Sequence, residues 1–232
     1  MIRAAFAFAT TLFVVATPGL AQTKVPIGRF AADARLVSSG LPNERGWTPT
    51  VPTATVLPSR GLGLEVGAHV YVLRIGAATF GVGASWMTAR GKSSPLGVPQ
   101  TTPTTPTTPT TPTTPTVAAI PDVRTRVTSI APQVSLNFGH SLGWSYLSAG
   151  LGRARALSEA ALASSTVSFT PRESGWVKTL NFGGGARWYV NDHFGFGFDL
   201  RWHKISLVAA TNTHPGAGRA SLLVAGAGVV LK

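Results

Sequence analysis

The strongest constraint on the fold is an alternation of apolar residues with small or polar ones, with a period of two. It is clearest in residues 194–202, which read FGFGFDLRW. Every second residue there is Phe, Leu or Trp, while glycine, Asp199 and Arg201 occupy the positions between. Successive side chains of a β-strand point to opposite faces of the sheet. The alternation therefore predicts a strand with one apolar face and one face of glycine and charge.

The same alternation recurs along the chain and predicts eight strands. Only 12% of the residues are charged and 26 are glycine, a composition that favours strands over helices. Pro132 falls within one predicted strand, and we expect a local bulge there because proline cannot donate to the ladder. The last segment is apolar at both parities, so its pattern leaves the two faces unassigned. The predicted strands are residues 29–37, 61–73, 77–88, 126–138, 144–153, 179–190, 194–205 and 219–231.

The connections between the predicted strands alternate strictly between long and short. One short link, Asn191-Asp192, is a pair typical of two-residue hairpin turns. In an up-and-down sheet this alternation places every long loop at one end and every tight turn at the other. The remaining short links are 74–76 and 139–143, and the longer links are 38–60, 89–124, 154–175 and 208–218.

The composition of the polar face decides which solvent each face meets. A soluble barrel, such as a lipocalin-like one, turns a lysine- and glutamate-rich face to water, whereas a membrane barrel turns its apolar face to lipid. Here the polar face holds mainly glycine, serine, threonine and asparagine, which suit the narrow interior of eight strands. We therefore predict an all-β, eight-stranded antiparallel up-and-down transmembrane β-barrel. We expect an aromatic girdle at the strand ends from Trp86, Trp144, Trp176, Trp188 and Trp202.

Two segments stand apart from the strands. Residues 1–21 combine Arg3, an apolar run and small residues before Gln22, which is typical of a secretory signal peptide. The barrel is then expected over residues 22–232. Residues 101–115 are five copies of Thr-Thr-Pro in a long extracellular loop, and the regular proline favours polyproline II. We interpret the repeat as a tolerated insertion; a stalk or a ligand for a partner is the alternative.

Together, the signal-like N-terminus, the eight alternating strands, the alternating links and the stretch LNFGGGARWYVNDHFGFGFDLRW (180–202) resemble a known family. They are similar to the small outer-membrane β-barrel domains of Gram-negative bacteria, the eight-stranded OmpA/OmpW-like barrels. The resemblance implies a location in the bacterial outer membrane.

The predicted polar faces would bring charged side chains of both signs into the barrel. Because a buried charge has to be paired, we interpret them as an ion-paired network that fills the lumen and fixes the strand register. The alternative is a polar pathway, which would make the protein a narrow channel or carrier for small hydrophobic or ionic solutes. The residues are Arg29, Asp33, Arg35, Glu65, His69, Arg187, Asp199 and Arg201, with His203 on the same face.

The sequence contains none of the common catalytic motifs. A nucleophile elbow, a zinc-binding His-Glu-x-x-His and a phosphate loop are all missing, as is the His-x-Ser pair of eight-stranded lipid A deacylases. We therefore predict a non-enzymatic structural or surface-interaction role with no catalytic residue, metal or cofactor; a lipid A-modifying enzyme is the third hypothesis.

The net charge of +12 raises the question of an anionic partner. The basic residues are dispersed, without the aromatic-interleaved patch of a nucleic-acid site, so no nucleic-acid partner is expected. Several flank the long loops, namely Arg60, Arg90, Lys92 and Arg124, where they could meet lipopolysaccharide. We expect a monomer that contacts outer-membrane lipid and lipopolysaccharide, with a loop partner that the sequence does not identify.

Overall fold

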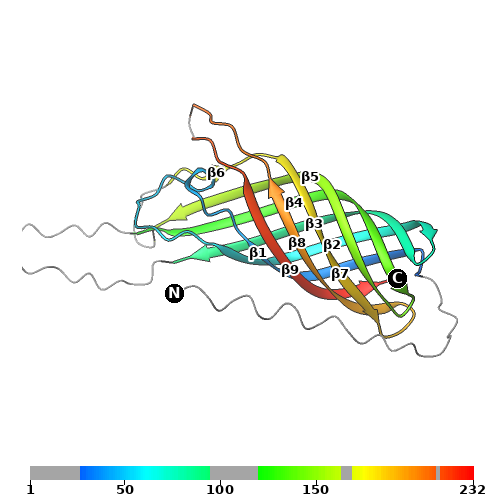
Figure 1. Cartoon of the computed structure of the whole chain (residues 1–232). Coiled ribbons are helices and arrows are strands. Elements are labelled where there is room, and N and C mark those ends of the chain that lie inside the picture. Colours follow the sequence, from blue (N-terminus) through cyan, green and yellow to red (C-terminus); the bar gives the residue numbers. More distant parts are fainter. Residues whose placement is uncertain (1–26, 95–119, 163–168, 213–214) are drawn as a thin grey trace, which may run out of the picture.

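The computed structural model describes residues 27–94, 120–162, 169–212 and 215–232, and in it eight long antiparallel strands close into a barrel (Figure 1). The ring closes between the first and last strands of the chain. The expected fold class is therefore confirmed. Two short elements, the 3-10 helix η1 (Arg45–Trp47) and β6 (Arg172–Glu173), lie in the connections. The long strands are β1 (Phe30–Gly40), β2 (Arg60–Ile75), β3 (Ala78–Ser93), β4 (Asp122–His140), β5 (Gly143–Ala161), β7 (Val177–Tyr189), β8 (Phe194–Ile205) and β9 (Ala220–Leu231).

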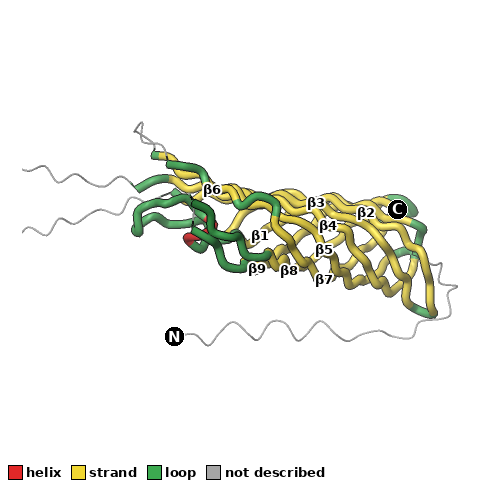
Figure 2. The backbone as a smooth tube through the Cα atoms, turned by 90° about the horizontal axis from the view of Figure 1, so that it is seen from above, coloured by secondary structure: helices red, strands yellow, loops and turns green. Residues whose placement is uncertain are grey.

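The connections are arranged as the alternation of their lengths predicts. The long ones lie at one end of the barrel, which we call the loop end, and the tight ones lie with the C-terminus at the other, the turn end (Figures 1 and 2). The turn between β7 and β8 is longer than the two residues expected. It spans Val190 to His193, and the Asn191 side-chain oxygen accepts hydrogen bonds from the backbone N–H groups of His193 and Phe194.

Strands β3, β4 and β5 reach further at the loop end than predicted. β4 and β5 are 19 residues long, whereas a strand needs only about 9–11 residues to span a bilayer. The added residues still alternate between the two faces. Most of their outward positions carry charge, among them Lys92, Arg124 and Arg155, although Leu157 of β5 also faces outward. The apolar alternation therefore ends before the strands do, and the sequence predicts loop where the strands leave the apolar zone.

The bulge expected at Pro132 is wrong. Pro132 pairs with Ala84 of β3 in an unbroken register, and the β4–β5 register is the same on both sides of it. The irregularity lies elsewhere, between Tyr71 and Leu73, where the β2–β3 register shifts. Near the turn end, that shift leaves Val72 without a direct partner on β3.

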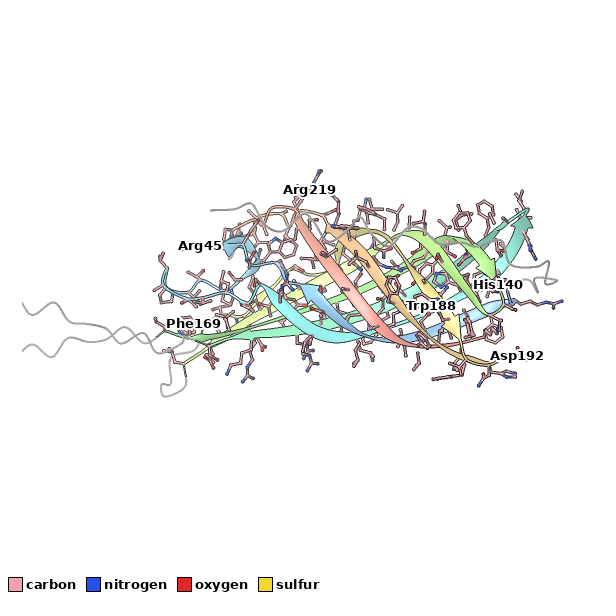
Figure 3. The ribbon with its side chains drawn as sticks, turned by 60° about the horizontal axis from the view of Figure 1, so that its bottom comes forward. Arg45, His140, Phe169, Trp188, Asp192 and Arg219 are labelled. Carbon is pink, nitrogen blue, oxygen red and sulfur yellow. The ribbon has the colours of Figure 1, made fainter. Side chains whose placement is uncertain are left out.

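The orientation of the faces is as predicted. Phe196 and Phe198 on the outer wall are 52% and 48% exposed, whereas Asp199 beside them is 2% exposed. The outer wall is thus apolar, and Trp188 lies on it near the turn end (Figure 3). The expectation for Trp144 is wrong, because this side chain is buried in the lumen and takes no part in the aromatic girdle. None of the helical residues that the structure describes forms a segment able to cross a membrane.

Strand β9 is apolar on both faces because it crosses two apolar layers of the lumen. Leu222 and Val224 point inward at the loop end, and Val230 points inward at the turn end. Only glycines separate these layers on its inner face, and Leu223 and Val229 face outward. The parity that the sequence left open is settled by this layering.

Candidate functional site

The lumen is built in three layers along the barrel axis. An aromatic layer fills the turn end, a layer of charged and polar side chains fills the middle, and an apolar layer fills the loop end. The middle layer contains the charged residues singled out in the sequence. We call the ion-paired set in this layer the lumen network; it consists of Asp33, Arg35, Glu65, Tyr146, Arg187, Asp199 and Arg201.

Asp33 on β1 is held by two arginines. Arg187 on β7 grips its carboxylate with two hydrogen bonds, from Nε to Oδ1 at 2.9 Å and from Nη2 to Oδ2 at 2.7 Å. Arg35 approaches the same Oδ2 at 3.0 Å. Arg187 also donates from Nη1 to the Tyr71 hydroxyl at 3.0 Å, and its guanidinium lies 4.2 Å from the Tyr146 ring centroid. Asp33 therefore ties β1 to β7 across the lumen.

Asp199 on β8 is the second anionic centre. Arg201 grips it with Nε and Nη2, both at 3.0 Å from the carboxylate oxygens. The Tyr146 hydroxyl donates to Asp199 Oδ2 at 2.6 Å and accepts from Arg35 Nη2 at 3.1 Å. Tyr146 therefore connects the two centres through Arg35. The sequence placed Tyr146 on the polar face but gave no signal that it would join the ions.

Glu65 completes the lumen network. It lies directly opposite Arg35 in the β1–β2 register, with 3.7 Å between Glu65 Oε2 and Arg35 Nη1. The network thus holds three arginines and three carboxylates, in equal number. A buried arginine without a carboxylate would be strongly destabilising. The equal numbers explain how so much charge can occupy a narrow interior.

Three sequence-predicted residues lie outside these ion pairs. Arg29 precedes β1 and is exposed at the turn end, so it is not part of the lumen. His69 and His203 are buried in the middle layer, but their ring nitrogens have no hydrogen-bond partner among the described residues. In the part of the chain that the structure describes, neither histidine forms an ion pair with the network.

Glycines make room for the large side chains of the network. A Cβ at Gly185 would lie 2.9 Å from the Tyr146 hydroxyl, the atom that connects the two anionic centres. A Cβ at Gly81 would lie 2.8 Å from a ring carbon of Tyr71. The glycine-rich inner faces are therefore the complement of the aromatic and charged residues opposite them.

Aromatic side chains close the turn end of the lumen. The rings of Trp144 and Tyr189 stack with centroids 4.8 Å apart, and Tyr71 meets Trp144 edge-to-face at 5.9 Å. The ammonium of Lys232 lies 4.3 Å from the Tyr189 ring. Ala31 and Val230 pack into the same cluster. This layer separates the lumen network from solvent at the turn end.

The loop end is closed by an apolar layer together with folded connections. Met87, Val127 and Leu222 pack inside the barrel, and Trp47 of η1 covers them at 2% exposure. Trp47 Nε1 donates to the Gly218 carbonyl at 3.1 Å, which ties the β1–β2 and β8–β9 connections together. Arg45 beside Trp47 marks this cap in Figure 3.

Arg172 of β6 links a third connection, between β5 and β7, to the other two by hydrogen bonds. Its Nε donates to the Gly46 carbonyl at 3.0 Å, and its Nη2 donates to the Pro215 carbonyl at 2.9 Å. Arg172 is 4% exposed, so these bonds are shielded from solvent. Three connections therefore form one lid above the apolar layer. Nothing in the sequence pattern singled out Trp47 or Arg172.

Basic side chains encircle the outer wall at the loop end, directly beyond the apolar zone. Among the outward positions at this level, each long strand except β1 carries a lysine or arginine, on the strand or just before it. We call this ring the collar. It includes Arg60 and Arg90, which the sequence placed beside the long loops. The collar consists of Arg60, Arg90, Arg126, Arg153, Lys178, Lys204 and Arg219.

Residues 1–21 and 101–115 lie outside the described residues. The signal peptide, and the place of the Thr-Thr-Pro repeat in an extracellular loop, therefore stay predictions. Among the described residues no cluster of His, Asp or Glu could hold a metal ion.

Comparisons with known proteins agree with the barrel. No family model and no curated protein matches the sequence. Among solved structures, Neisserial surface protein A (NspA) matches with a TM-score of 0.52 and 16% identity over 88% of this chain and 97% of its own. Ail, the attachment invasion locus protein of Yersinia pestis, matches with a TM-score of 0.46 and 12% identity over 88% of this chain and 99% of its own. The outer membrane protease OmpT of Escherichia coli matches with a TM-score of 0.45 and 8% identity over 87% of this chain and 96% of its own. The likeness to NspA thus shows that the chain has the fold of the small outer-membrane β-barrels.

Proposed function

We propose that this chain is a non-enzymatic protein of the bacterial outer membrane with a structural or surface-interaction role. One observation carries the proposal: the outer wall is apolar, while aromatic, charged and apolar side chains fill successive layers of the lumen. Asp33 and Asp199 are each gripped by an arginine, so the charges of the lumen serve the barrel itself. The surface available to partners is then the loop end and its collar.

Lipopolysaccharide is the partner that the collar supports best. A ring of lysine and arginine directly beyond an apolar zone lies at the height of anionic headgroups. Long cationic side chains at that height gain attraction without leaving the interface. The proposal assigns the loop end to the outer leaflet and the turn end to the periplasm.

Fractionation combined with gel mobility tests this proposal. The full chain should fractionate with outer membranes and migrate differently before and after boiling, as a closed barrel does. Recovery in the soluble periplasmic fraction with a single, heat-independent mobility would refute the membrane role and favour a soluble barrel.

A narrow channel is the second candidate. It is favoured by buried polar atoms of the middle layer that have no hydrogen-bond partner among the described residues, among them Glu65 Oε2, Arg201 Nη1 and the ring nitrogens of His203. The aromatic layer and the lid oppose it at the two ends. Planar-bilayer recordings separate the candidates, because steady single-channel steps from the wild-type chain would establish transport and reject a sealed lumen.

Lipid A modification is a third, enzymatic possibility. Mass spectrometry of lipid A after expression of the full chain tests it directly. A mass change that depends on the chain would replace the non-enzymatic proposal.

A further inference from the structure

On the outer wall, directly opposed residues of β3 and β4 have side chains of the same chemical type, and this type changes along the strands. The two strands lie side by side, with directly opposed residues along their whole shared length (Figure 1). From the turn end to the loop end, the pairs pass from apolar to hydroxyl to cationic. The two hydroxyls, of Thr88 and Thr128, lie 3.4 Å apart. The outward pairs are Phe80/Leu136, Val82/Val134, Ala84/Pro132, Trp86/Ile130, Thr88/Thr128, Arg90/Arg126 and Lys92/Arg124.

This order matches the depth profile of a bilayer. Residues 78–86 of β3 provide the outward apolar stretch, close to the length that a tilted strand needs to cross the hydrocarbon. Arg90 lies four residues beyond Trp86, which is about 13 Å along the strand at roughly 3.3 Å per residue. At a tilt of about 45°, this is about 9 Å along the membrane normal. The Arg90 side chain therefore lies at the level of lipid headgroups.

The cationic pairs share one concave patch of the wall. Arg90, Lys92, Arg124 and Arg126 line it, together with Leu157 and Glu159 of β5. We call this patch the cationic groove. Two of its four cations face two others directly across the sheet, and like charges in that position repel each other.

The acidic residues nearby leave the centre of the groove uncompensated. Lys92 has a partner, because its ammonium lies 2.6 Å from the Asp122 carboxylate. Glu159 lies opposite Arg124 at the edge of the groove. Arg90 and Arg126 have no ion-pair partner among the described residues. The directly opposed arginines are thus the part of the groove where an external anion would gain the most electrostatic attraction.

We propose that the cationic groove binds a phosphate of the lipid A class of outer-leaflet glycolipid, with Arg90 and Arg126 as its principal ligands. The inference rests on the membrane role proposed above. Two guanidinium groups facing each other can each offer a fork of N–H donors to one phosphate, and Lys92 adds a further donor. The acyl chains would then follow the outer wall past Trp86 and Ile130. A membrane lipid is favoured over a free anion because the groove opens on the wall that carries the apolar zone.

Binding of lipid A by the full chain in phosphatidylcholine nanodiscs tests the proposal. Diphosphorylated lipid A and its dephosphorylated form are compared, because they share the same sugar and acyl chains. The wild-type chain should prefer the diphosphorylated form, and Arg90→Gln/Arg126→Gln should weaken its binding by about tenfold or more, since several charge-assisted hydrogen bonds are lost. Inorganic phosphate added alone should not displace the lipid.

Two double variants remove the same charge elsewhere. Arg29→Gln/Arg74→Gln acts at the turn end, where both arginines are exposed, and should leave lipid A binding within about twofold. Arg153→Gln/Lys178→Gln removes a second directly opposed cationic pair, on β5 and β7, that does not line the groove. A loss of binding in this variant equal to that of Arg90→Gln/Arg126→Gln would mean that the whole collar acts diffusely, and would overturn the groove as a site.

The remaining outcomes separate the two proposals. A wild-type chain that folds with heat-modifiable mobility but binds both lipid A forms equally refutes the groove and leaves the membrane role standing. Displacement of the lipid by inorganic phosphate would also overturn the assignment, in favour of a free anion. A chain that does not insert at all refutes the membrane role first.

Discussion

The lumen and the outer wall use arginine in opposite ways. Inside the barrel, Arg187 and Arg201 each grip a carboxylate with two hydrogen bonds. On the wall, Arg90 faces Arg126 and Arg153 faces Lys178. The arginines and carboxylates of the interior thus form ion pairs with one another, whereas Arg90 and Arg126 of the collar have no ion-pair partner among the described residues. Pairing is obligatory in a low-dielectric interior, while headgroups and salt can screen an exposed cation.

The largest effect that tests this contrast should come from breaking the lumen network at Asp33. Asp33→Ala leaves Arg187 without its carboxylate and removes one partner of Arg35. Removing one member of a buried ion pair typically costs about 3–5 kcal/mol. The free energy of unfolding, measured by urea titration of the protein in lipid vesicles, should fall by that order.

An exposed ion pair is the matched control for Asp33. Asp122 forms its ion pair with Lys92 on the outside, and Asp122→Ala should leave the unfolding midpoint nearly unchanged. Equal losses from Asp33→Ala and Asp122→Ala would contradict the distinction between the two regions.

A smaller effect should follow from Tyr146→Phe. The Tyr146 hydroxyl donates to Asp199 and accepts from Arg35, so its removal unlinks the two anionic centres. The expected loss is about 1–3 kcal/mol in the same urea titration, since the buried partners lose a hydrogen bond to charge. Tyr189→Phe is the control, because the Tyr189 hydroxyl is buried without a hydrogen-bond partner among the described residues. A loss at Tyr189 as large as that at Tyr146 would show that the linkage is unimportant.

The sequence predicts the barrel well because a period of two is preserved wherever lipid meets the outer wall. Phe196 and Phe198 point to the hydrocarbon, and Asp199 and Arg187 point inward, as the alternation requires. The strand ends were less predictable. Beyond Thr88 the outward residues of β3 turn cationic, so the strand continues where the apolar pattern stops.

The arrangement of the lumen was only partly predictable. Parity placed Asp33 and Arg35 inside, but the cross-barrel partners come from strands far apart in the chain, and parity carries no information on such contacts. Trp47 and Arg172 of the lid lie in connections between the long strands, where the sequence has no period to indicate which side chains are buried. The apolar layers at both ends of the lumen also hid the parity of β9, because apolar residues then occur on both of its faces.

On the outer wall, relieving repulsion should stabilise the barrel slightly. Arg90→Gln/Arg126→Gln removes two directly opposed like charges, and such pairs are unfavourable by roughly 0.2–1 kcal/mol. In a neutral detergent, without anionic lipid, the unfolding midpoint should therefore stay the same or rise. A clear fall would mean that these arginines stabilise the barrel itself, which contradicts the contrast with the lumen.

The smallest effect concerns the pH dependence of the Lys92–Asp122 pair, which lies at the loop end beyond the apolar zone. The hydrogen bond from Lys92 holds the pKa of the Asp122 carboxyl below its usual value of 3.8. A carboxyl with a lowered folded-state pKa contributes stability above its unfolded pKa, and this contribution is lost as the pH falls through the folded value. The unfolding midpoints of the wild type and Asp122→Asn should therefore differ slightly at neutral pH and converge in acid below 3.8. Because the pair is exposed, added salt should reduce the difference at neutral pH as well. A difference that grows in acid would contradict this sign, and would show that the Asp122 carboxylate does not stabilise the folded barrel through its ion pair with Lys92.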